Sequence, residues 1–220
     1  MTVRFNRIVT RRSARYFLLG DRQGVDEVWF VLHGYSQLAQ NFLKWFEPVV
    51  RPGRLIVAPE GLSRAYFEEH GTRRVGASWM TKEDREAEIE DYIAYLDQVA
   101  DEVIGAIPPR SRIEVHGFSQ GGATASRWAT FGHHAISRLV LWGSTLPPDL
   151  DLERLRGNLR DAPIVLAVGE RDQFVFGEQV RSERGRLLGL GFNVEWRGFP
   201  GGHVVDKETL VGLGLSFERA

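Results

Sequence analysis

Residues 117–122 read Gly-Phe-Ser-Gln-Gly-Gly, a stretch that contains the pattern Gly-x-Ser-x-Gly. A strand-like run at 113–115 leads into it, and a helix-compatible stretch rich in small residues follows at 120–132. This context predicts a nucleophile elbow, in which a strand turns sharply into a helix and presents a strained serine at the turn. Glycine is needed on both sides because a side chain there would clash with neighbouring backbone. Ser119 is therefore the candidate nucleophile, and the alternative is a glycine-rich turn whose serine caps a helix.

A serine hydroxyl needs a base, and a group that orients the base, before it attacks a carbonyl. After this type of elbow, the acidic residue and then the histidine follow along the chain. Asp172 comes after the strand-like run at 164–168, and His203 lies in a glycine-rich loop before the last predicted helix. We therefore expect His203 to be the base and Asp172 its orienter. Glu170, two residues earlier, is the rival orienter, and Asp149 and Asp151 are weaker candidates because they follow the preceding strand.

A further loop completes the predicted site. Residues 32–35 read Leu-His-Gly-Tyr and follow the strand-like run at 28–32. Oxyanion-hole donors come from the residue after the nucleophile and from this early loop, so we expect the backbone N–H groups of Gln120 and Tyr35 to hold the oxyanion. His33 is expected to be structural and to bond to its own loop.

Strand-like and helical patterns alternate along the chain. Runs that are mostly apolar on both faces lie at 28–32, 55–58, 113–115, 139–142 and 164–168, with an alternating run at 193–199 and an edge strand expected at 15–19. Helical patterns lie at 38–50, 82–104, 120–132, 177–190 and after residue 205, and Thr81 with Asp84 resembles a capping box at the second of these. This order predicts an α/β protein with a mostly parallel central sheet of about 7 strands and helices on both faces. No linker or repeat interrupts the pattern, so we expect residues 1–220 to form a single domain.

Composition excludes several classes of function. The 220 residues are 43% hydrophobic and 26% charged, as in a packed globular domain, and they contain no cysteine for a disulfide, a cysteine-ligated metal or a cysteine nucleophile. The net charge of −1 argues against a nucleic-acid-binding protein, and no apolar run is long enough for a membrane span. Arginines gather near the N-terminus, but the apolar region that an export signal needs stops at Gly20, so we expect a cytoplasmic protein.

Signatures of bound cofactors and metals are missing. The chain has neither the glycine-rich phosphate loop that ends in Lys-Ser/Thr nor a dinucleotide-binding Gly-x-Gly-x-x-Gly after its first strand. His133 and His134 are adjacent and lack metal-ligand spacing, so a solvated helix end is expected there.

Taken together, the chain resembles the α/β-hydrolases of the phospholipase/carboxylesterase family, which includes acyl-protein thioesterases and small bacterial carboxylesterases. The residues that carry the resemblance are His33-Gly34, the stretch 117–123, Gly169 with Asp172 and Val175, and Gly202-His203. The resemblance implies an α/β-hydrolase fold and a Ser-His-Asp hydrolase that acts on carboxylic esters or thioesters. It also implies that the enzyme needs no metal and no organic cofactor.

The chain departs from the family pattern outside the three catalytic positions. Residues 35–37 read Tyr-Ser-Gln where the family often has Leu and an acidic residue, and residues 175–177 read Val-Phe-Gly where it often has Val-Val-Pro. Of the family's Arg-x-Trp-Tyr/Phe-Asp pattern, only residues 78–80 align. These departures leave the substrate open.

The sequence suggests an open site. The interval 143–163 is too short for a helical cap, so no cap domain is expected, and the long loop 60–81 would wall the acyl side. The candidate substrate contacts, each of which equally fits ordinary packing, are Phe118, Trp79, Leu146, Phe174 and Phe176.

The leading hypothesis is an esterase for short to medium acyl chains. An acyl-protein or acyl-coenzyme A thioesterase is the chemical alternative, because a thiol leaves more readily from the same acyl-enzyme. A non-catalytic binding protein on the hydrolase fold is the alternative from another class, since a fold does not determine function. Monomer and homodimer both remain open.

Overall fold

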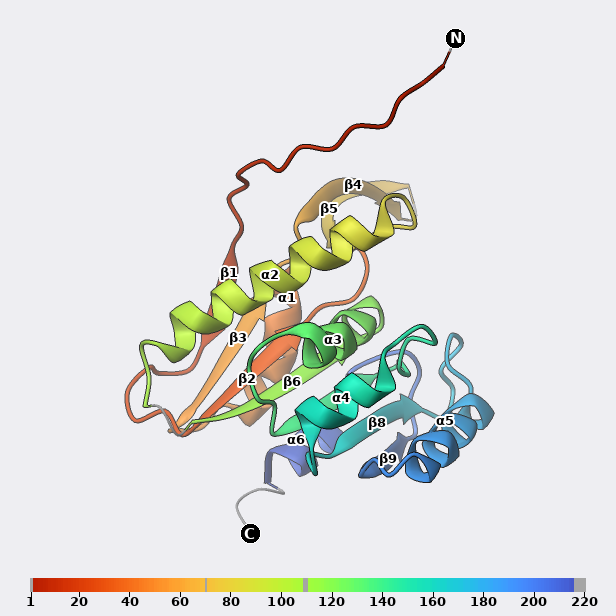
Figure 1. Ribbon diagram of the computed structural model, residues 1–220. Coiled ribbons are helices and arrows are strands. Elements are labelled where there is room, and N and C mark those ends of the chain that lie inside the picture. Colours follow the sequence, from red (N-terminus) through yellow and green to blue (C-terminus); the bar gives the residue numbers. More distant parts are fainter. Residues whose placement is uncertain (1, 70, 109–110, 216–220) are drawn as a thin grey trace.

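A seven-stranded sheet forms the centre of the computed structural model, which describes residues 2–69, 71–108 and 111–215 (Figure 1). Its strand order is β1-β3-β2-β6-β7-β8-β9. The edge strand β1 (Tyr16–Leu19) is antiparallel to its neighbour, and the other strands pair in parallel. Those strands are β3 (Arg54–Pro59), β2 (Glu27–Leu32), β6 (Arg112–Phe118), β7 (Arg138–Trp142), β8 (Ile164–Gly169) and β9 (Val194–Phe199). The mostly parallel α/β sheet expected from the sequence is confirmed.

Helices cover both faces of this sheet because its central strands are apolar on both sides. Along β2, Val28 and Phe30 join the apolar core on one face, and Trp29 and Val31 join the core on the other. The first core is covered by α2 (Arg85–Ile104), α3 (Gln120–Phe131), α4 (Leu152–Leu159) and α5 (Gly177–Gly189) (Figure 1). The second is covered by α1 (Ala39–Leu43), the 3-10 helix η1 (Lys44–Val49) and α6 (Lys207–Leu215). None of the helices in the described ranges is long and apolar enough to cross a membrane.

Two elements differ from the sequence-based expectation. The expected loop 60–81 contains an antiparallel hairpin of β4 (Ser63–Glu69) and β5 (Thr72–Ser78), whose polar sequence gives little strand signal. The interval 143–163 contains the short helix α4, and the chain still has no cap there.

The expected capping box at the start of α2 is wrong. The helix begins at Arg85, and its N-cap residue Asp84 has a left-handed φ of 47° and no side-chain cap bond. Thr81 instead donates its backbone N–H and its hydroxyl to the carboxylate of Glu88, one turn inside the helix.

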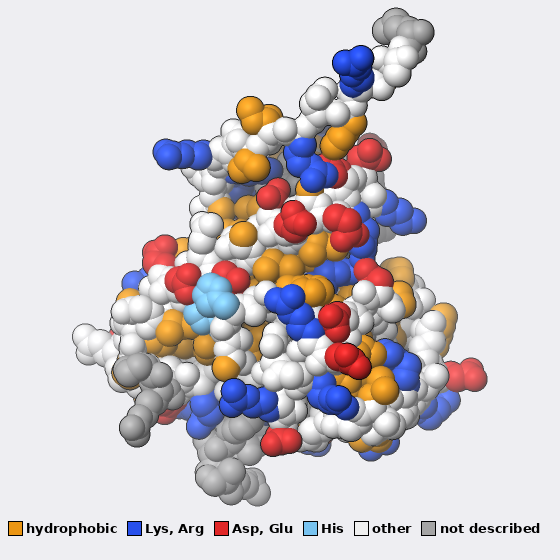
Figure 2. Space-filling model, in the orientation of Figure 1, with side chains coloured by type: hydrophobic (Ala, Val, Ile, Leu, Met, Phe, Trp, Pro, Cys, Tyr) orange, Lys and Arg blue, Asp and Glu red, His pale blue; other side chains and the backbone are white. Residues whose placement is uncertain are grey.

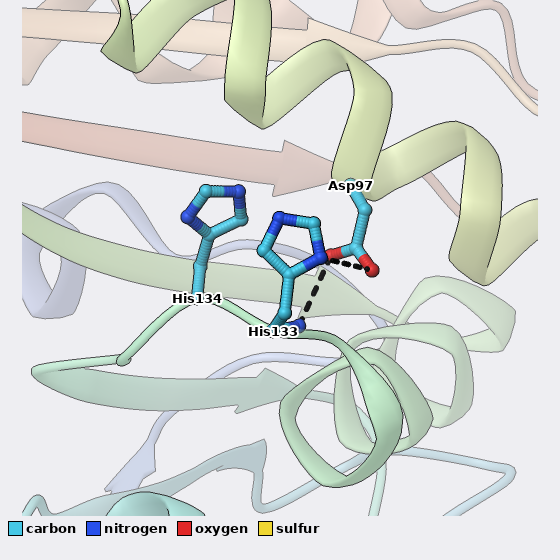
Figure 3. A group of neighbouring side chains, drawn as sticks. All are labelled: Asp97, His133 and His134. Atoms are coloured by element: carbon cyan, nitrogen blue, oxygen red, sulfur yellow. Dashed lines mark hydrogen bonds and ion pairs between the residues drawn. The ribbon is translucent and has the colours of Figure 1, made fainter.

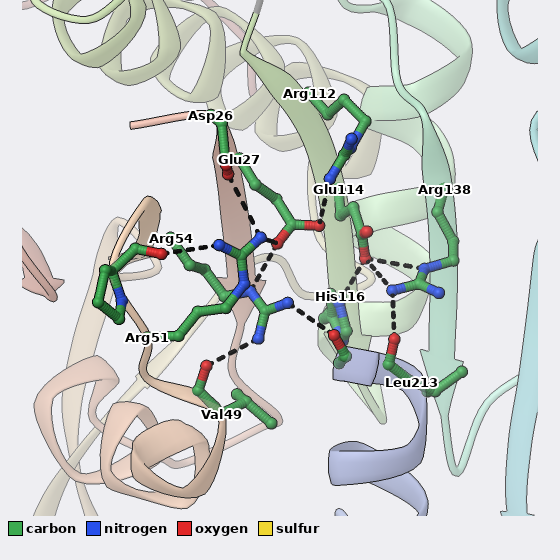
Figure 4. A network of polar contacts seen from close by, with 12 residues as sticks. Asp26, Glu27, Val49, Arg51, Arg54, Arg112, Glu114, His116, Arg138 and Leu213 are labelled. Atoms are coloured by element: carbon green, nitrogen blue, oxygen red, sulfur yellow. Dashed lines mark hydrogen bonds and ion pairs between the residues drawn. The ribbon is translucent and has the colours of Figure 1, made fainter. Parts of the chain in front are cut away.

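A buried ionic layer crosses the sheet near the starts of the central strands (Figure 4). Arg54 Nε bonds Glu27 Oε2 at 2.6 Å, and Arg138 Nε bonds Glu114 Oε2 at 2.8 Å. Both guanidinium groups also donate to carbonyl oxygens at the end of α6, at 2.9 Å each. Burial raises the pKa of Glu114 to about 8 against the opposing effect of Arg138, and the neighbouring Glu27 carboxylate adds to the rise. The layer ties sheet and helix together at the end of the strands away from the predicted site.

Candidate active site

Ser119 occupies the turn between β6 and α3 in a strained backbone conformation, with φ of 53° and ψ of −117°. A non-glycine residue in such a conformation costs about 1–3 kcal/mol and persists only where the surroundings impose it. Neighbouring backbone does so here. A Cβ on Gly117 would lie 2.3 Å from the Gly121 carbonyl oxygen, and one on Gly121 would lie 2.2 Å from that of Leu32. The two glycines of the motif are thus required by close backbone approach, and the turn has the conformation of a nucleophile elbow.

Asp172 and His203 are brought together although 31 residues separate them. Their contact joins Asp172 Oδ2 to His203 Nδ1 at 2.8 Å, with the carboxylate fully buried and the imidazole 15% exposed. The other carboxylate oxygen, Oδ1, accepts the backbone N–H groups of Phe174 and Val175 at 2.8 and 3.0 Å. Asp172 is therefore held from one side by its own loop and presents its second oxygen to the imidazole.

The imidazole lies beside the elbow. The Phe118 ring, one residue before Ser119, is centred 4.7 Å from the His203 ring. On the next strand, Trp142 accepts the Ser119 N–H at 2.9 Å, and a Cβ on the following residue, Gly143, would lie 2.7 Å from His203 Nδ1. The two adjacent residues Trp142 and Gly143 therefore contact the Ser119 turn and the Asp172–His203 pair, respectively.

The rival acidic residues lie elsewhere. Asp149 forms ion pairs with Arg85 and Arg127. Glu170 is exposed and lines a cavity of about 450 Å³ together with Arg181 and Trp196. Of these three carboxylates, only that of Asp172 contacts the imidazole of His203.

In the loop after β2, the backbone N–H groups on both sides of Tyr35 are bonded. Gly34 N–H bonds the side-chain oxygen of Gln37 at 2.8 Å, Ser36 N–H bonds the Ala77 carbonyl at 2.9 Å, and Gln37 N–H bonds back to Gly34. The Tyr35 N–H makes no hydrogen bond to any residue in the described ranges, and it is the donor that the sequence predicted for the oxyanion. Gln120 is the first residue of α3, so its N–H is one of the open donors of the helix.

Side-chain bonds lock this loop to the elbow. The Gln120 side chain accepts the Trp79 N–H at 3.1 Å and donates to the Met80 carbonyl at 2.8 Å. Trp79 in turn donates its indole N–H to the His33 carbonyl at 2.8 Å. The hairpin residue Arg74 donates to the Ser36 carbonyl at 2.7 Å. The β4–β5 hairpin and the segment after it therefore hold both expected oxyanion donors in place.

His33 makes the structural contacts expected of it. Its Nδ1 lies 2.8 Å from the Gly34 carbonyl oxygen, and its Nε2 accepts the Gly61 N–H at 2.9 Å. Burial lowers the pKa of His33 to about 4, so the ring is neutral near pH 7. With both nitrogens occupied, it has no free atom for proton transfer.

The five candidate substrate contacts fall into two groups. Phe174 and Phe176 are 64% and 59% exposed, and the Phe174 ring is centred 4.7 Å from His203. Phe118, Trp79 and Leu146 are at most 5% exposed and pack inside the protein. The second group offers almost no surface to a substrate and supports the site from within.

Sequence reasoning missed three supporting positions: Gly143, Gln37 and the side chain of Gln120. Gly143 could have been noticed as a glycine directly after a predicted strand, at the edge of the sheet where sites form. The two glutamines carry no sequence signal of their own, because their partners lie on other segments.

Comparison with known proteins identifies the family of this chain. Residues 23–211 match the family described as Phospholipase/Carboxylesterase. A protein described as a probable carboxylesterase from Oryza sativa subsp. japonica is 32% identical over 127 residues, which are 57% of this chain and 46% of that protein. Acyl-protein thioesterase 1 from Gibberella zeae is 32% identical over 116 residues, 51% of this chain and 49% of that protein. The chain thus spans about half the length of these curated relatives.

Solved structures share the fold across nearly the whole chain. Acyl-protein thioesterase 2 from Zea mays superposes with a TM-score of 0.70 at 17% identity, covering 94% of this chain and 98% of that one. The carboxylesterase from Bacillus cereus gives 0.68 at 17% identity and covers 94% of both chains. The family match over most of the chain carries the conclusion: this protein belongs to the phospholipase/carboxylesterase family of α/β-hydrolases.

Proposed function

We propose that this chain is a serine hydrolase that cleaves carboxylic esters of short to medium acyl chains. Ser119 is the nucleophile, His203 the general base and acid, and Asp172 the residue that orients the imidazole. The observation that carries the proposal is the 2.8 Å bond between Asp172 Oδ2 and His203 Nδ1 beside a serine held at φ 53°. No metal and no organic cofactor takes part in the proposed chemistry.

Acylation begins when Ser119 Oγ attacks the carbonyl carbon of the ester and its proton passes to His203 Nε2. Asp172 stabilises the imidazolium that forms and keeps the Nδ1 proton directed at its own carboxylate. The negative charge develops on the former carbonyl oxygen, where the N–H groups of Tyr35 and Gln120 receive it. The intermediate collapses, the C–O bond to the alcohol breaks, and the alcohol takes the proton from His203. An acyl ester of Ser119 remains.

Deacylation repeats these steps with water. His203 accepts a proton from a water molecule, and the resulting hydroxide adds to the acyl carbon. The same two N–H groups stabilise the second oxyanion. Its collapse releases the carboxylic acid, and the proton on His203 returns to Ser119 Oγ, so the enzyme is regenerated.

The surroundings of the site favour a small, exposed ester. The exposed Phe174 ring beside His203 offers apolar contact to a substrate, and Tyr35 packs edge-on against Phe67 of the hairpin with ring centres 5.2 Å apart. Only the short helix α4 lies between β7 and β8, so no cap covers this side. An exposed aromatic contact of this kind is enough for the short and medium acyl chains that we propose as substrates.

A thioesterase is the second candidate. The names of two relatives, acyl-protein thioesterase 1 from Gibberella zeae and acyl-protein thioesterase 2 from Zea mays, favour it. The same acyl-enzyme would form, with a thiol leaving in place of an alcohol. The cytoplasmic location expected from the sequence stays a prediction, as does the choice between monomer and homodimer.

The test is steady-state hydrolysis of p-nitrophenyl esters from acetate to laurate, alongside one acyl thioester of matched chain length. We expect kcat/KM to peak at a short or medium chain and to vanish in Ser119→Ala. A folded Ser119→Ala variant that keeps more than a few per cent of the rate would overturn the assignment of the nucleophile. Turnover of the thioester alone would replace the esterase by the thioesterase.

A further inference from the structure

Two histidines and two aspartates outside the proposed active site meet between α2 and the end of α3, and Figure 3 shows Asp97, His133 and His134 of this group. Asp97 and Asp101 are four residues apart on α2, so they share one face of that helix. His133 and His134 follow the C-terminus of α3. One ligand atom each from Asp97, His133 and His134 lies within 4.8 Å of the other two.

The two nitrogens of His133 face different carboxylates. Its Nε2 forms a hydrogen bond of 2.9 Å with Asp101 Oδ1, and its Nδ1 lies 3.1 Å from Asp97 Oδ2 (Figure 3). When Nε2 carries the proton that Asp101 accepts, Nδ1 presents its lone pair toward the Asp97 carboxylate. A lone pair and a carboxylate oxygen that converge in this way favour a cation between them.

His134 adds a second nitrogen donor. Its side chain is only 16% exposed, and its Nε2 is buried without a hydrogen bond to any residue in the described ranges. That atom lies 3.0 Å from Asp101 Oδ1, and the two imidazole rings are centred 4.3 Å apart. A neutral imidazole carries a lone pair on one ring nitrogen, which a cation can bind.

A hydrogen bond from a neighbouring indole orients Asp97 for this role. Its Oδ1 accepts the indole N–H of Trp128 at 2.8 Å, which leaves Oδ2 directed at His133. The hydrogen bond from His133 Nε2 to Asp101 fixes that imidazole in the same way. Such outer carboxylates and donors accompany the histidine ligands of metal sites in proteins.

We propose that Asp97, His133 and His134 bind a zinc ion, with Asp101 as the carboxylate that holds His133. Two imidazole nitrogens and one carboxylate oxygen suit Zn²⁺ and exclude the hard cations Ca²⁺ and Mg²⁺, which prefer oxygen donors alone. Zinc bonds of about 2.0–2.1 Å in a tetrahedron place ligand atoms about 3.4 Å apart, so donors that lie within 4.8 Å of one another must close by about 1.4 Å or less. The side chain of His133 is 57% exposed and can move that far.

The ion would join α2 to the end of α3 and leave the proposed catalytic residues untouched. Zinc binding in the proposed experiment would overturn the expectation of a solvated helix end at His133 and His134. The spacing along the chain is indeed unsuitable, but the fold supplies the third ligand from a helix 36 residues away.

The experiment is isothermal titration of the chelator-treated, tag-free protein with Zn²⁺, followed by thermal unfolding with and without the ion. We expect one Zn²⁺ per chain with micromolar or tighter affinity and a rise in Tm of about 3 °C or more. His133→Ala and Asp97→Asn should each weaken Zn²⁺ binding at least tenfold. Mg²⁺ should bind neither the wild type nor the variants. Asp97→Asn keeps the oxygen that accepts the Trp128 N–H, so it tests ligation without removing that bond.

The control is Asp91→Asn, which neutralises an exposed carboxylate on the same helix and should bind Zn²⁺ like the wild type. The readouts are binding and Tm, so they are independent of the proposed hydrolase activity. Wild-type protein that binds no Zn²⁺ below millimolar concentration would overturn the proposal. So would unchanged affinity in both ligand variants, since the ion would then sit elsewhere.

Discussion

A Cβ atom on Gly143 would lie 2.7 Å from His203 Nδ1 and 3.1 Å from Asp172 Oδ2, so this glycine leaves the space in which the two side chains meet. Its φ of 53° also favours glycine. The residue follows β7 directly and anchors to β8 through its N–H on the Ala167 carbonyl, at 2.9 Å. The position of the imidazole is thus determined by backbone as well as by the carboxylate.

Gly143→Ala should lower kcat by about 10²-fold or more, because the added methyl group displaces the imidazole from its productive geometry. Steady-state kinetics on the best p-nitrophenyl ester measure the loss. Gly157→Ala in α4 is the matched control, since a Cβ there meets nothing within 4 Å, and it should keep the wild-type rate. Equal rates in both variants would show that the contact does not matter.

Asp172→Asn should lower kcat by about 10⁴-fold with little change in stability, because an amide no longer keeps the imidazole in the required tautomer. The amide oxygen can still accept the N–H groups of Phe174 and Val175. Glu170→Gln, two residues away and exposed, should stay close to the wild type. If Glu170→Gln carried the loss instead, the assignment of the orienter would be reversed.

Gln120→Met should cost about 1–3 kcal/mol of the free energy of unfolding, because the Trp79 N–H loses its acceptor. It should also lower kcat by about tenfold, since the loop that holds the oxyanion donors loosens while the backbone N–H of residue 120 remains. Urea denaturation and kinetics on the same preparation measure both. Gln120→Glu keeps the acceptor for Trp79 but places an oxygen against the Met80 carbonyl in place of the amide donor, so it should not recover the stability. Unchanged stability and rate in Gln120→Met would show that this side chain does not hold the loop.

Glu114 should make stability depend on pH at the alkaline side. Burial raises its folded-state pKa to about 8 from an ordinary value of 4.5, so its stabilising contribution is complete below pH 4.5 and is lost as the pH rises through about 8. The wild type should lose about 1 kcal/mol more than Glu114→Gln between pH 7 and 9, because the amide cannot ionise. Urea denaturation at a series of pH values measures the difference. Parallel curves of the free energy of unfolding against pH for the two proteins would contradict the raised pKa of Glu114.

Hydrophobic periodicity and motif order were enough to predict most of the fold. The central strands and the helices at 120–132 and 177–190 were predictable because each element shows its own apolar pattern. The β4–β5 hairpin was not, because its strands are mostly exposed and polar, and no local pattern indicates the Gln37–Ala77 bridge that joins β5 to a distant loop. The buried polar side chains of Glu27, Arg54 and Glu114 also break the apolar pattern of their strands.

The candidate site, like the fold, could be predicted only in part. Ser119, Asp172 and His203 were singled out by type and chain order, and the fold places them on loops at the same edge of the sheet. The free N–H of Tyr35 was expected from the family pattern, but the bonds that leave it free depend on Gln37 and Ala77, which no local pattern links. The structure shows that Phe174 and Phe176 are exposed whereas Phe118 is buried. The sequence alone does not report the exposure of a single phenylalanine.

The most direct test of the central claim is the mass of the intact protein after rapid acid quench of a reaction with p-nitrophenyl acetate. An acyl-enzyme on Ser119 predicts an added acetyl group of about 42 Da, located by peptide mapping to the segment containing residue 119. Its build-up should be greater in Asp172→Asn if deacylation slows more than acylation, and it should be absent in Ser119→Ala. An acetyl group on another residue, or one that also forms in Ser119→Ala, would contradict the account.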